Sequence, residues 1–251
     1  NFSLLPIGAN TFADSLINTS QVLYHFKKND LSNQLFLVED LLNLITGAIE
    51  KSRLTPGIDM AISIQIKDSM YLNSNTYQLP GFKSEIGSDE MCGNLINFLD
   101  YYPVISIQNP FSPLDTGGWV KLSWAAAEKT QIIKSNYFKL RTYKFEPERP
   151  FKAYNTITLS LNHSSTVSEL RDEMLEAKSN GTDLIIEPNL GNNNKNFQHQ
   201  LAIGWNLKQI RLENILEGNE CIRLARVMHQ RSKLDLAVDG SLPKKEKFPW
   251  R

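Results

Sequence analysis

The sequence predicts an α/β fold in which a parallel sheet closes into a (β/α)8 barrel. Short apolar runs rich in β-branched residues alternate with longer segments whose apolar residues recur at helical spacing. Nearly continuous apolar strands are typical of parallel sheets that helices cover. The chain has 251 residues, which favours one large barrel over an open sheet. We therefore expect a single barrel domain over residues 1–251, with its first strand cut short at residue 1.

The strand prediction follows the apolar runs in order. The clearest run is 104–109 (VISIQN), which Pro110 stops because proline cannot donate a hydrogen bond to the sheet. The predicted strands are 57–66, 104–109, 131–135, 156–161, 183–187 and 209–212. Chemistry in such barrels lies at the carboxyl ends of the strands, so the last residues of each strand are the candidates for function.

Segments with helical periodicity separate these strands. Residues 166–180 give the best-bounded helix, because Gly181 supplies the residue that favours a helix end. The predicted helices are 11–28, 35–51, 89–101, 114–129, 166–180, 197–207 and 218–230.

The charge balance argues against a nucleic-acid or acidic-membrane partner. Lysine and arginine number 27 and aspartate and glutamate number 27, so the net charge is zero. No apolar run approaches the roughly 18 residues that a membrane span needs. Cys92 and Cys221 lie far apart without metal-binding spacing, which predicts free thiols in a reducing compartment.

Several motifs, all in the same order, resemble the barrel domain of enolase. Residues 57–63 (GIDMAIS) resemble the family's G-M-D-V-A-A-S, and 102–111 (YPVISIQNPF) resemble Y-P-V-V-S-I-E-D-P-F. Residues 162–169 (NHSSTVSE) are similar to N-Q-I-G-S-V-T-E, and 223–226 (RLAR) to R-L-A-K. The resemblance implies an enolase-type (β/α)8 TIM barrel, with the family's N-terminal capping domain absent from this chain.

The resemblance also implies where a magnesium site would lie. Enolases hold Mg²⁺ with three carboxylates at successive strand ends, and oxygen ligands of this kind suit the ion. The first carboxylate is retained as Asp59. The second corresponds to Gln108, which Asn109 follows in place of the family's aspartate, and the third to Ser135. Because only one anion survives, we expect no bound metal and no cofactor.

The residues that would carry the reaction are altered as well. The family's catalytic lysine corresponds to Ser160, whose hydroxyl is no base without an activating partner. Its second active-site lysine corresponds to Arg211, which cannot lose its proton. The S-H-R-S clamp for the substrate phosphate corresponds to Glu187 and the three residues after it, Pro188, Asn189 and Leu190.

This combined loss predicts a catalytically inactive enolase-like pseudoenzyme that serves as a structural or scaffolding subunit of a larger protein assembly. Divergent enolase-like proteins occur in cilia and sperm flagella, so the resemblance implies a cytoplasmic location that extends to that cytoskeleton. Protein partners are expected, and membrane or nucleic-acid partners are not. Two alternatives stay open: a functional Mg-dependent lyase that converts 2-phosphoglycerate to phosphoenolpyruvate, and a pocket that binds a neutral metabolite.

Ordinary structural roles compete with each functional reading. We favour Asp59 as a hydrogen-bonded strand-end residue over a metal ligand, and His163 as a loop histidine over a relocated base. Residues 139–152 mix basic and aromatic side chains that could touch an acidic partner, but a solvated insertion is favoured. The tryptophans could form an interface, although packing is expected. They are Trp119, Trp124, Trp205 and Trp250.

Overall fold

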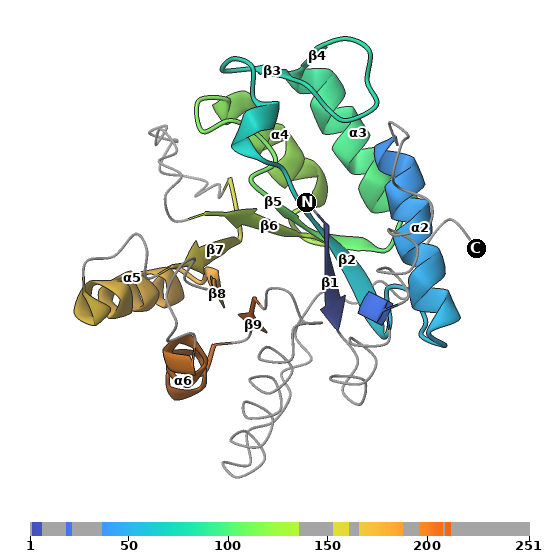
Figure 1. The fold of residues 1–251 in the computed structure, drawn as a ribbon. Helices are drawn as coiled ribbons and strands as arrows, with labels where there is room; N and C mark the ends of the chain where they lie inside the picture. The colour runs from blue at the N-terminus through green and yellow to red at the C-terminus, as the bar shows by residue number, and fades with distance from the viewer. Residues whose placement is uncertain are drawn as a thin grey trace. The chain divides into compact units, whose positions relative to one another are not determined.

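The computed structural model describes residues 2–6, 19–21, 37–135, 153–160, 166–187, 196–207 and 209–211. The chain divides into two compact units. The first contains residues 1–133, 138–154 and 242–251, and the second contains 134–137 and 155–241. Both alternate strands with helices, which confirms the α/β prediction (Figure 1). That the whole chain forms one domain stays a prediction.

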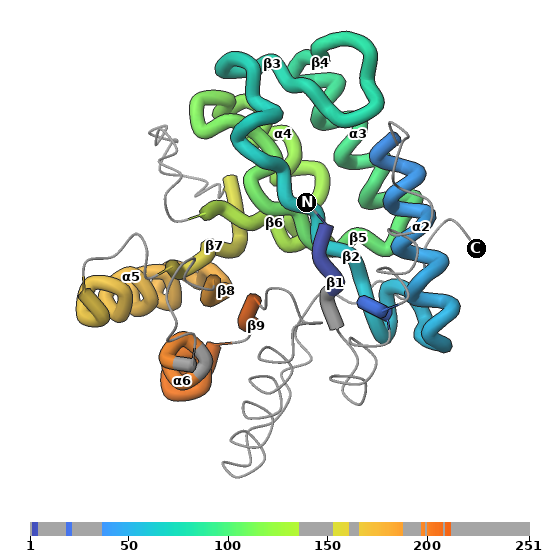
Figure 2. The backbone as a smooth tube through the Cα atoms, in the orientation of Figure 1, coloured from blue at the N-terminus to red at the C-terminus, as the bar shows by residue number. Residues whose placement is uncertain are grey.

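The first unit is built on a sheet in the order β1-β2-β5-β6. These strands are β1 (Phe2–Pro6), β2 (Met60–Gln65), β5 (Val104–Gln108) and β6 (Gln131–Lys134). The last three run parallel, whereas β1 pairs with β2 in the antiparallel direction, in contrast to the all-parallel expectation. Almost every residue of β2 and β5 is buried, which explains their nearly continuous apolar sequence. The backbone trace in Figure 2 follows this succession from β2 to β6.

Among the described residues of this unit, the long helices are α2 (Val38–Lys51), α3 (Ser88–Tyr101) and α4 (Thr116–Ala126). Each buries one apolar stripe, as an amphipathic helix on a sheet must. Between β2 and α3 lie a short 3-10 helix (Asp68–Met70) and a small hairpin of β3 (Thr76–Tyr77) and β4 (Ile86–Gly87). The sequence patterns did not predict this hairpin.

The second unit has a parallel sheet in the order β7-β8-β9, namely β7 (Thr156–Leu159), β8 (Asp183–Ile186) and β9 (Gln209–Ile210). Helix α5 (Val167–Ser179) packs on β7 and β8, and α6 (Asn196–Gly204) packs on β9. Outward-facing Leu159 and Leu184 meet Leu170 and Met174 of α5 in a small apolar core. Alternation along β7 therefore turns Thr156 and Thr158 toward the opposite face of the sheet, here called the inner face.

Local chemistry accounts for the boundaries that differ from the sequence patterns. Helix α4 begins at Thr116 rather than at residue 114 because the Asp115 side chain accepts a hydrogen bond from Gly118 N and caps the helix. Helix α5 begins at Val167, one residue after the predicted start, because Thr166 is its N-cap and forms a capping box with Glu169. Of the predicted helix 11–28 only 19–21 are described, as helix, and 218–230 lie outside the described residues.

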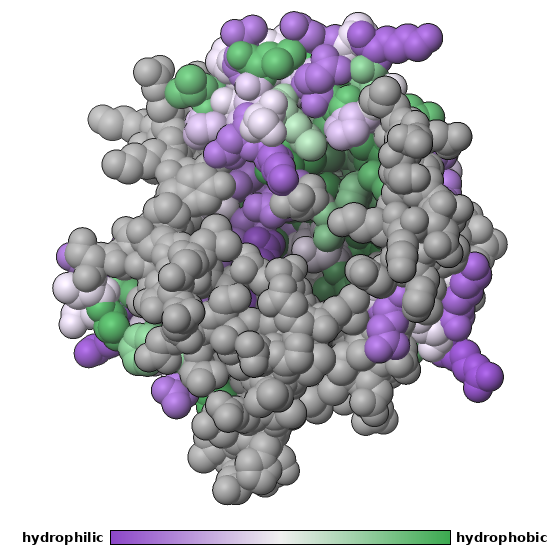
Figure 3. Space-filling view, in the orientation of Figure 1, coloured by the Kyte–Doolittle hydropathy of each residue, from purple (hydrophilic) through white to green (hydrophobic). Residues whose placement is uncertain are grey.

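The described surface mixes polar and apolar residues. In the described part of the face shown in Figure 3, hydrophilic and hydrophobic side chains lie side by side. Within the described ranges, no helix combines the length and the apolar character that crossing a bilayer demands.

Candidate functional site

Asp59 lies at the amino end of β2, away from the end where the resemblance places a metal. Its Oδ2 accepts a hydrogen bond from Thr55 N at 2.8 Å, and its own N donates to Thr55 O at 2.9 Å. The carboxylate thus closes the turn that leads into the strand. In the β2–β5 register Gln108 pairs with Gln65, six residues beyond Asp59. At about 3.3 Å per residue this separation is roughly 20 Å, so the structure does not bring Asp59 and Gln108 together.

The carboxyl end of β5 presents neutral amide side chains. Gln108 and Asn109 are completely buried. Asn109 adopts a left-handed backbone conformation with φ of 50°, which asparagine tolerates better than most residues. Its N donates to Ile133 O at 2.9 Å and its carbonyl accepts from the Tyr71 hydroxyl at 2.6 Å. The backbone of this strand end is therefore held by hydrogen bonds to β6 and to the loop after β2.

A buried network fixes the loop that follows β5. The Tyr77 hydroxyl donates to Asp115 Oδ2 at 2.6 Å and accepts from Ser112 N at 3.3 Å. Burial, and then the hydrogen bond to Asp115, raise the pKa of Tyr77 far above its usual value. Trp119 Nε1 donates to Ser112 O at 3.1 Å, and Phe111 packs edge-to-face on Tyr77. All of these groups serve the fold of the loop, which leaves the Tyr77 hydroxyl unsuited to proton transfer near neutral pH.

In the second unit, Ser135 and Ser160 each follow directly on a strand, and both are buried. The ammonium group of the neighbouring Lys134 donates to Ser135 O at 3.4 Å. Burial lowers the pKa of Lys134, and the negative charge of Glu173 opposes this change. Ser160 shares the inner face of β7 with Thr156 and Thr158, so hydroxyl groups alone line this strand on that side.

The ends of β8 and β9 carry an ion pair. Arg211 Nη1 donates to Glu187 Oε1 at 2.7 Å, and the two side chains are only 20% and 15% exposed. Backbone hydrogen bonds align the strand ends, because Glu187 N donates to Leu159 O and Arg211 N donates to Ile186 O. The resemblance assigns the position of Arg211 to catalysis and that of Glu187 to phosphate binding. In this chain the charges of the two side chains neutralise each other. Residue patterns did not predict this pair, because 24 residues separate its members along the chain.

These donors fit Mg²⁺ poorly. The ion prefers carboxylate oxygens in a nearly octahedral arrangement, whereas Gln108 and Asn109 offer uncharged amides and Ser135 offers a hydroxyl. Over the described parts of the chain, no three His, Cys, Asp or Glu side chains form a group that could hold a metal. The clamp positions Pro188, Asn189 and Leu190 lie outside the described residues, as does His163.

Other candidates from the sequence take structural positions or fall outside the described residues. Cys92 is a free thiol inside α3, and burial raises its pKa. Trp119 is fully buried, Trp205 packs beside the core of the second unit, and Trp124 is 68% exposed. Cys221, Trp250 and residues 139–152 are among those not described.

The alternating strands and helices of the two units define a protein of the α/β class. Comparison with known families agrees with this class. The family described as "Enolase, C-terminal TIM barrel domain" matches residues 1–235, and the chain belongs to this family. A curated relative, an enolase from Natranaerobius thermophilus, is 26% identical over 249 residues. That match covers 91% of this chain but 58% of the relative's length, so the chain spans little more than half of that enolase.

Proposed function

We propose that this enolase-family domain does not catalyse the dehydration of 2-phosphoglycerate. The observation that carries the proposal is the ion pair between Arg211 and Glu187. A cation at the position of the family's second lysine would have to be available to an anionic substrate. Here it is held by a carboxylate of the same unit, in a largely buried setting where charge-assisted hydrogen bonds are strong.

The neighbouring positions support the same proposal. Removing a proton next to a carboxylate requires a base and a metal or cation that stabilises the enolate. Ser160 offers a hydroxyl in place of the base, and Gln108 offers a neutral amide in place of a ligand carboxylate. Asp59, the carboxylate that the resemblance retains, is hydrogen-bonded in a turn at the opposite end of its strand. We therefore propose that the domain binds no Mg²⁺ and no other cofactor.

We further propose that the domain serves as a structural or scaffolding subunit of a larger protein assembly. The support is that residues needed for the fold are kept while those needed for the reaction are replaced. The Thr166–Glu169 capping box of α5 and the motif at residues 102–111 are examples. A cytoplasmic setting that includes the cilium or flagellum rests on the resemblance alone. Imaging of the tagged protein tests it, and co-purification tests whether the partners are proteins rather than nucleic acid or membranes.

The deciding experiment is a 2-phosphoglycerate dehydration assay with excess Mg²⁺ on the whole chain, with an active enolase as the positive control. We expect no turnover from the wild type. We also expect none from Ser160→Lys, because a base alone restores neither the metal ligands nor the anion site. Magnesium-dependent turnover that Arg211→Ala abolishes would overturn the proposal. The chain would then be a functional lyase of the enolase class.

A matched series isolates the ion pair. Inorganic phosphate is titrated into the wild type, Glu187→Ser and, as a control, Glu90→Gln on the exposed surface of α3. The proposal expects phosphate binding to strengthen in Glu187→Ser alone, because this change removes the carboxylate that pairs with the Arg211 guanidinium. Equal phosphate binding by all three proteins would show that Glu187 does not block an anion site.

A further inference from the structure

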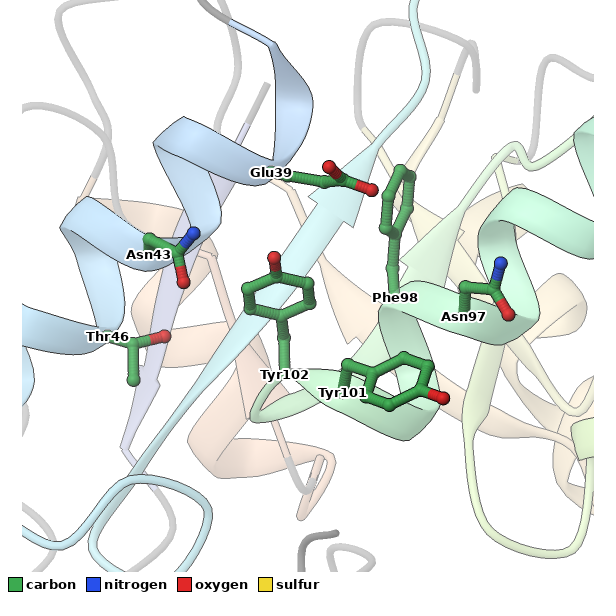
Figure 4. Close-up of a pocket in the computed structure, with 7 residues that line it drawn as sticks. All are labelled: Glu39, Asn43, Thr46, Asn97, Phe98, Tyr101 and Tyr102. Carbon is green, nitrogen blue, oxygen red and sulfur yellow. The ribbon is translucent and has the colours of Figure 1, made fainter. Parts of the chain in front are cut away.

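A groove of about 490 Å³ lies in the first unit between α2 and α3 (Figure 4). Two structural elements line it. Helix α2 contributes Glu39, Asn43 and Thr46, while α3 and the residue after it contribute Asn97, Phe98, Tyr101 and Tyr102. Tyr102 lies two residues before β5, so the groove is at the amino end of that strand. The enolase-type positions Gln108 and Asn109 are at the other end, and the groove is thus separate from them.

The groove combines aromatic rings with negative charge. Tyr101 is 59% exposed, so a ligand in the groove could reach its ring. In Figure 4 the Tyr102 hydroxyl points to the side where Glu39 lies. Burial, and next the charge of Glu39, raise the pKa of Tyr102, and Asp40 adds to this effect. Glu39 is the one charged side chain in the lining, which contains no lysine, arginine or histidine.

The carboxylate of Glu39 is available to a ligand. Its neighbour Asp40 accepts a hydrogen bond from Leu37 N and so caps α2. Glu39 is exposed, and no lysine or arginine in the described parts of the chain forms an ion pair with it. A carboxylate in the first turn of a helix also interacts favourably with the helix dipole. That role would account for Glu39 but not for the exposed ring of Tyr101 in the same groove.

We propose that this groove binds an arginine side chain from a basic segment of a partner protein. The planar guanidinium can stack on an aromatic ring and pair with a carboxylate at once, and the groove offers both groups. A divalent metal would need several oxygen ligands that carry charge, whereas Glu39 is the single carboxylate in the lining. The proposal does not depend on whether the domain is catalytically active.

The test is an NMR titration of the ¹⁵N-labelled whole chain with the tripeptide amide acetyl-Gly-Arg-Gly. The control ligand replaces arginine with citrulline, which has nearly the same shape and no charge. We expect weak binding of the arginine peptide, with shifts confined to the backbone amides of Asn97 and Tyr101 and to the side-chain amide of Asn43. Absence of shifts, shifts elsewhere, or equal binding of the citrulline peptide would overturn the proposal.

Variants then separate the groove from general electrostatic attraction. Glu39→Gln should weaken binding of the arginine peptide roughly fivefold, and Tyr101→Ala should weaken it about two- to fivefold. Glu90→Gln removes the same charge from the other end of α3 and should leave binding unchanged. If Glu90→Gln weakens binding as much as Glu39→Gln does, the attraction belongs to the surface as a whole and the groove is not a site. Unchanged amide spectra away from the substituted residue show that each variant is folded.

Discussion

Breaking the ion pair at the ends of β8 and β9 should destabilise the protein markedly. Glu187→Gln removes the negative charge and leaves the guanidinium of Arg211 in a largely buried position without its carboxylate. Water reaches only part of this site, so solvent replaces the lost partner incompletely. The substitution preserves the shape of the side chain, and therefore the measured change reports on charge rather than on packing.

The burial of the pair determines how much stability is lost when one partner is replaced. Removing one partner of a fully buried pair costs about 3–5 kcal/mol, whereas an exposed pair contributes about 0–1 kcal/mol. With exposures of 20% and 15% and a bond of 2.7 Å, we expect a loss of about 2 kcal/mol. For a protein of this size that loss lowers Tm by about 4–8 °C.

Thermal and urea denaturation of Glu187→Gln, Arg211→Met and the double variant form a double-mutant cycle. The two single changes should be non-additive, because either one already breaks the pair. The exposed pair of Lys121 and Asp89 gives the control, since Asp89→Asn should leave Tm unchanged. If Glu187→Gln is as neutral as Asp89→Asn, the side chains are not paired in solution and our argument about the anion site fails.

Three further predictions concern the fold. Because burial raises the pKa of Tyr77, the folded state keeps the phenol proton when the unfolded state loses it. The free energy of unfolding measured in urea should therefore fall as pH rises above about 10. This fall should be smaller in Tyr77→Phe. Gly118→Ala should lose about 1–3 kcal/mol in urea denaturation, because its Cβ would lie 2.6 Å from the Phe111 ring. Burial lowers the pKa of Lys134, so the unfolded state holds this proton at pH values where the folded state has lost it. The free energy of unfolding should therefore rise as the pH approaches the ordinary pKa of lysine, and Lys134→Met should remove that rise.

Each of these has a clear control. Gly47→Ala, within α2, has nothing within 4 Å of the added Cβ and should stabilise the protein by up to about 1 kcal/mol. A stable Gly118→Ala variant would show that Phe111 can move aside. For Tyr77 and Lys134 the measured quantity is the difference between wild type and variant at each pH, which cancels the titration of all other groups. A difference that does not change with pH would contradict the linkage argument.

Patterns along the sequence predicted most of the described elements. The apolar run at residues 104–109 gave β5, because a strand buried on both faces must be apolar throughout. Thr166 and Gly181 bounded α5, because capping depends on residues close in sequence. The hairpin of β3 and β4 was missed because its strands have only two residues each. A first strand was expected at the start of the chain, but the antiparallel direction of β1 was missed because direction depends on pairing with a distant strand.

The site shows the same division. Motifs along the chain were sufficient to place Gln108, Ser135 and Ser160 at strand ends, and to show that they carry no charge. Only the strand register shows that Gln108 lies beside Gln65, six residues along β2 from Asp59. Register depends on which backbone groups pair, and the sequence does not show this. The sequence by itself determined the fold class, the family resemblance and the altered residue types. Only the tertiary structure decided that Arg211 meets Glu187, because a contact between adjacent strand ends depends on how the sheet assembles.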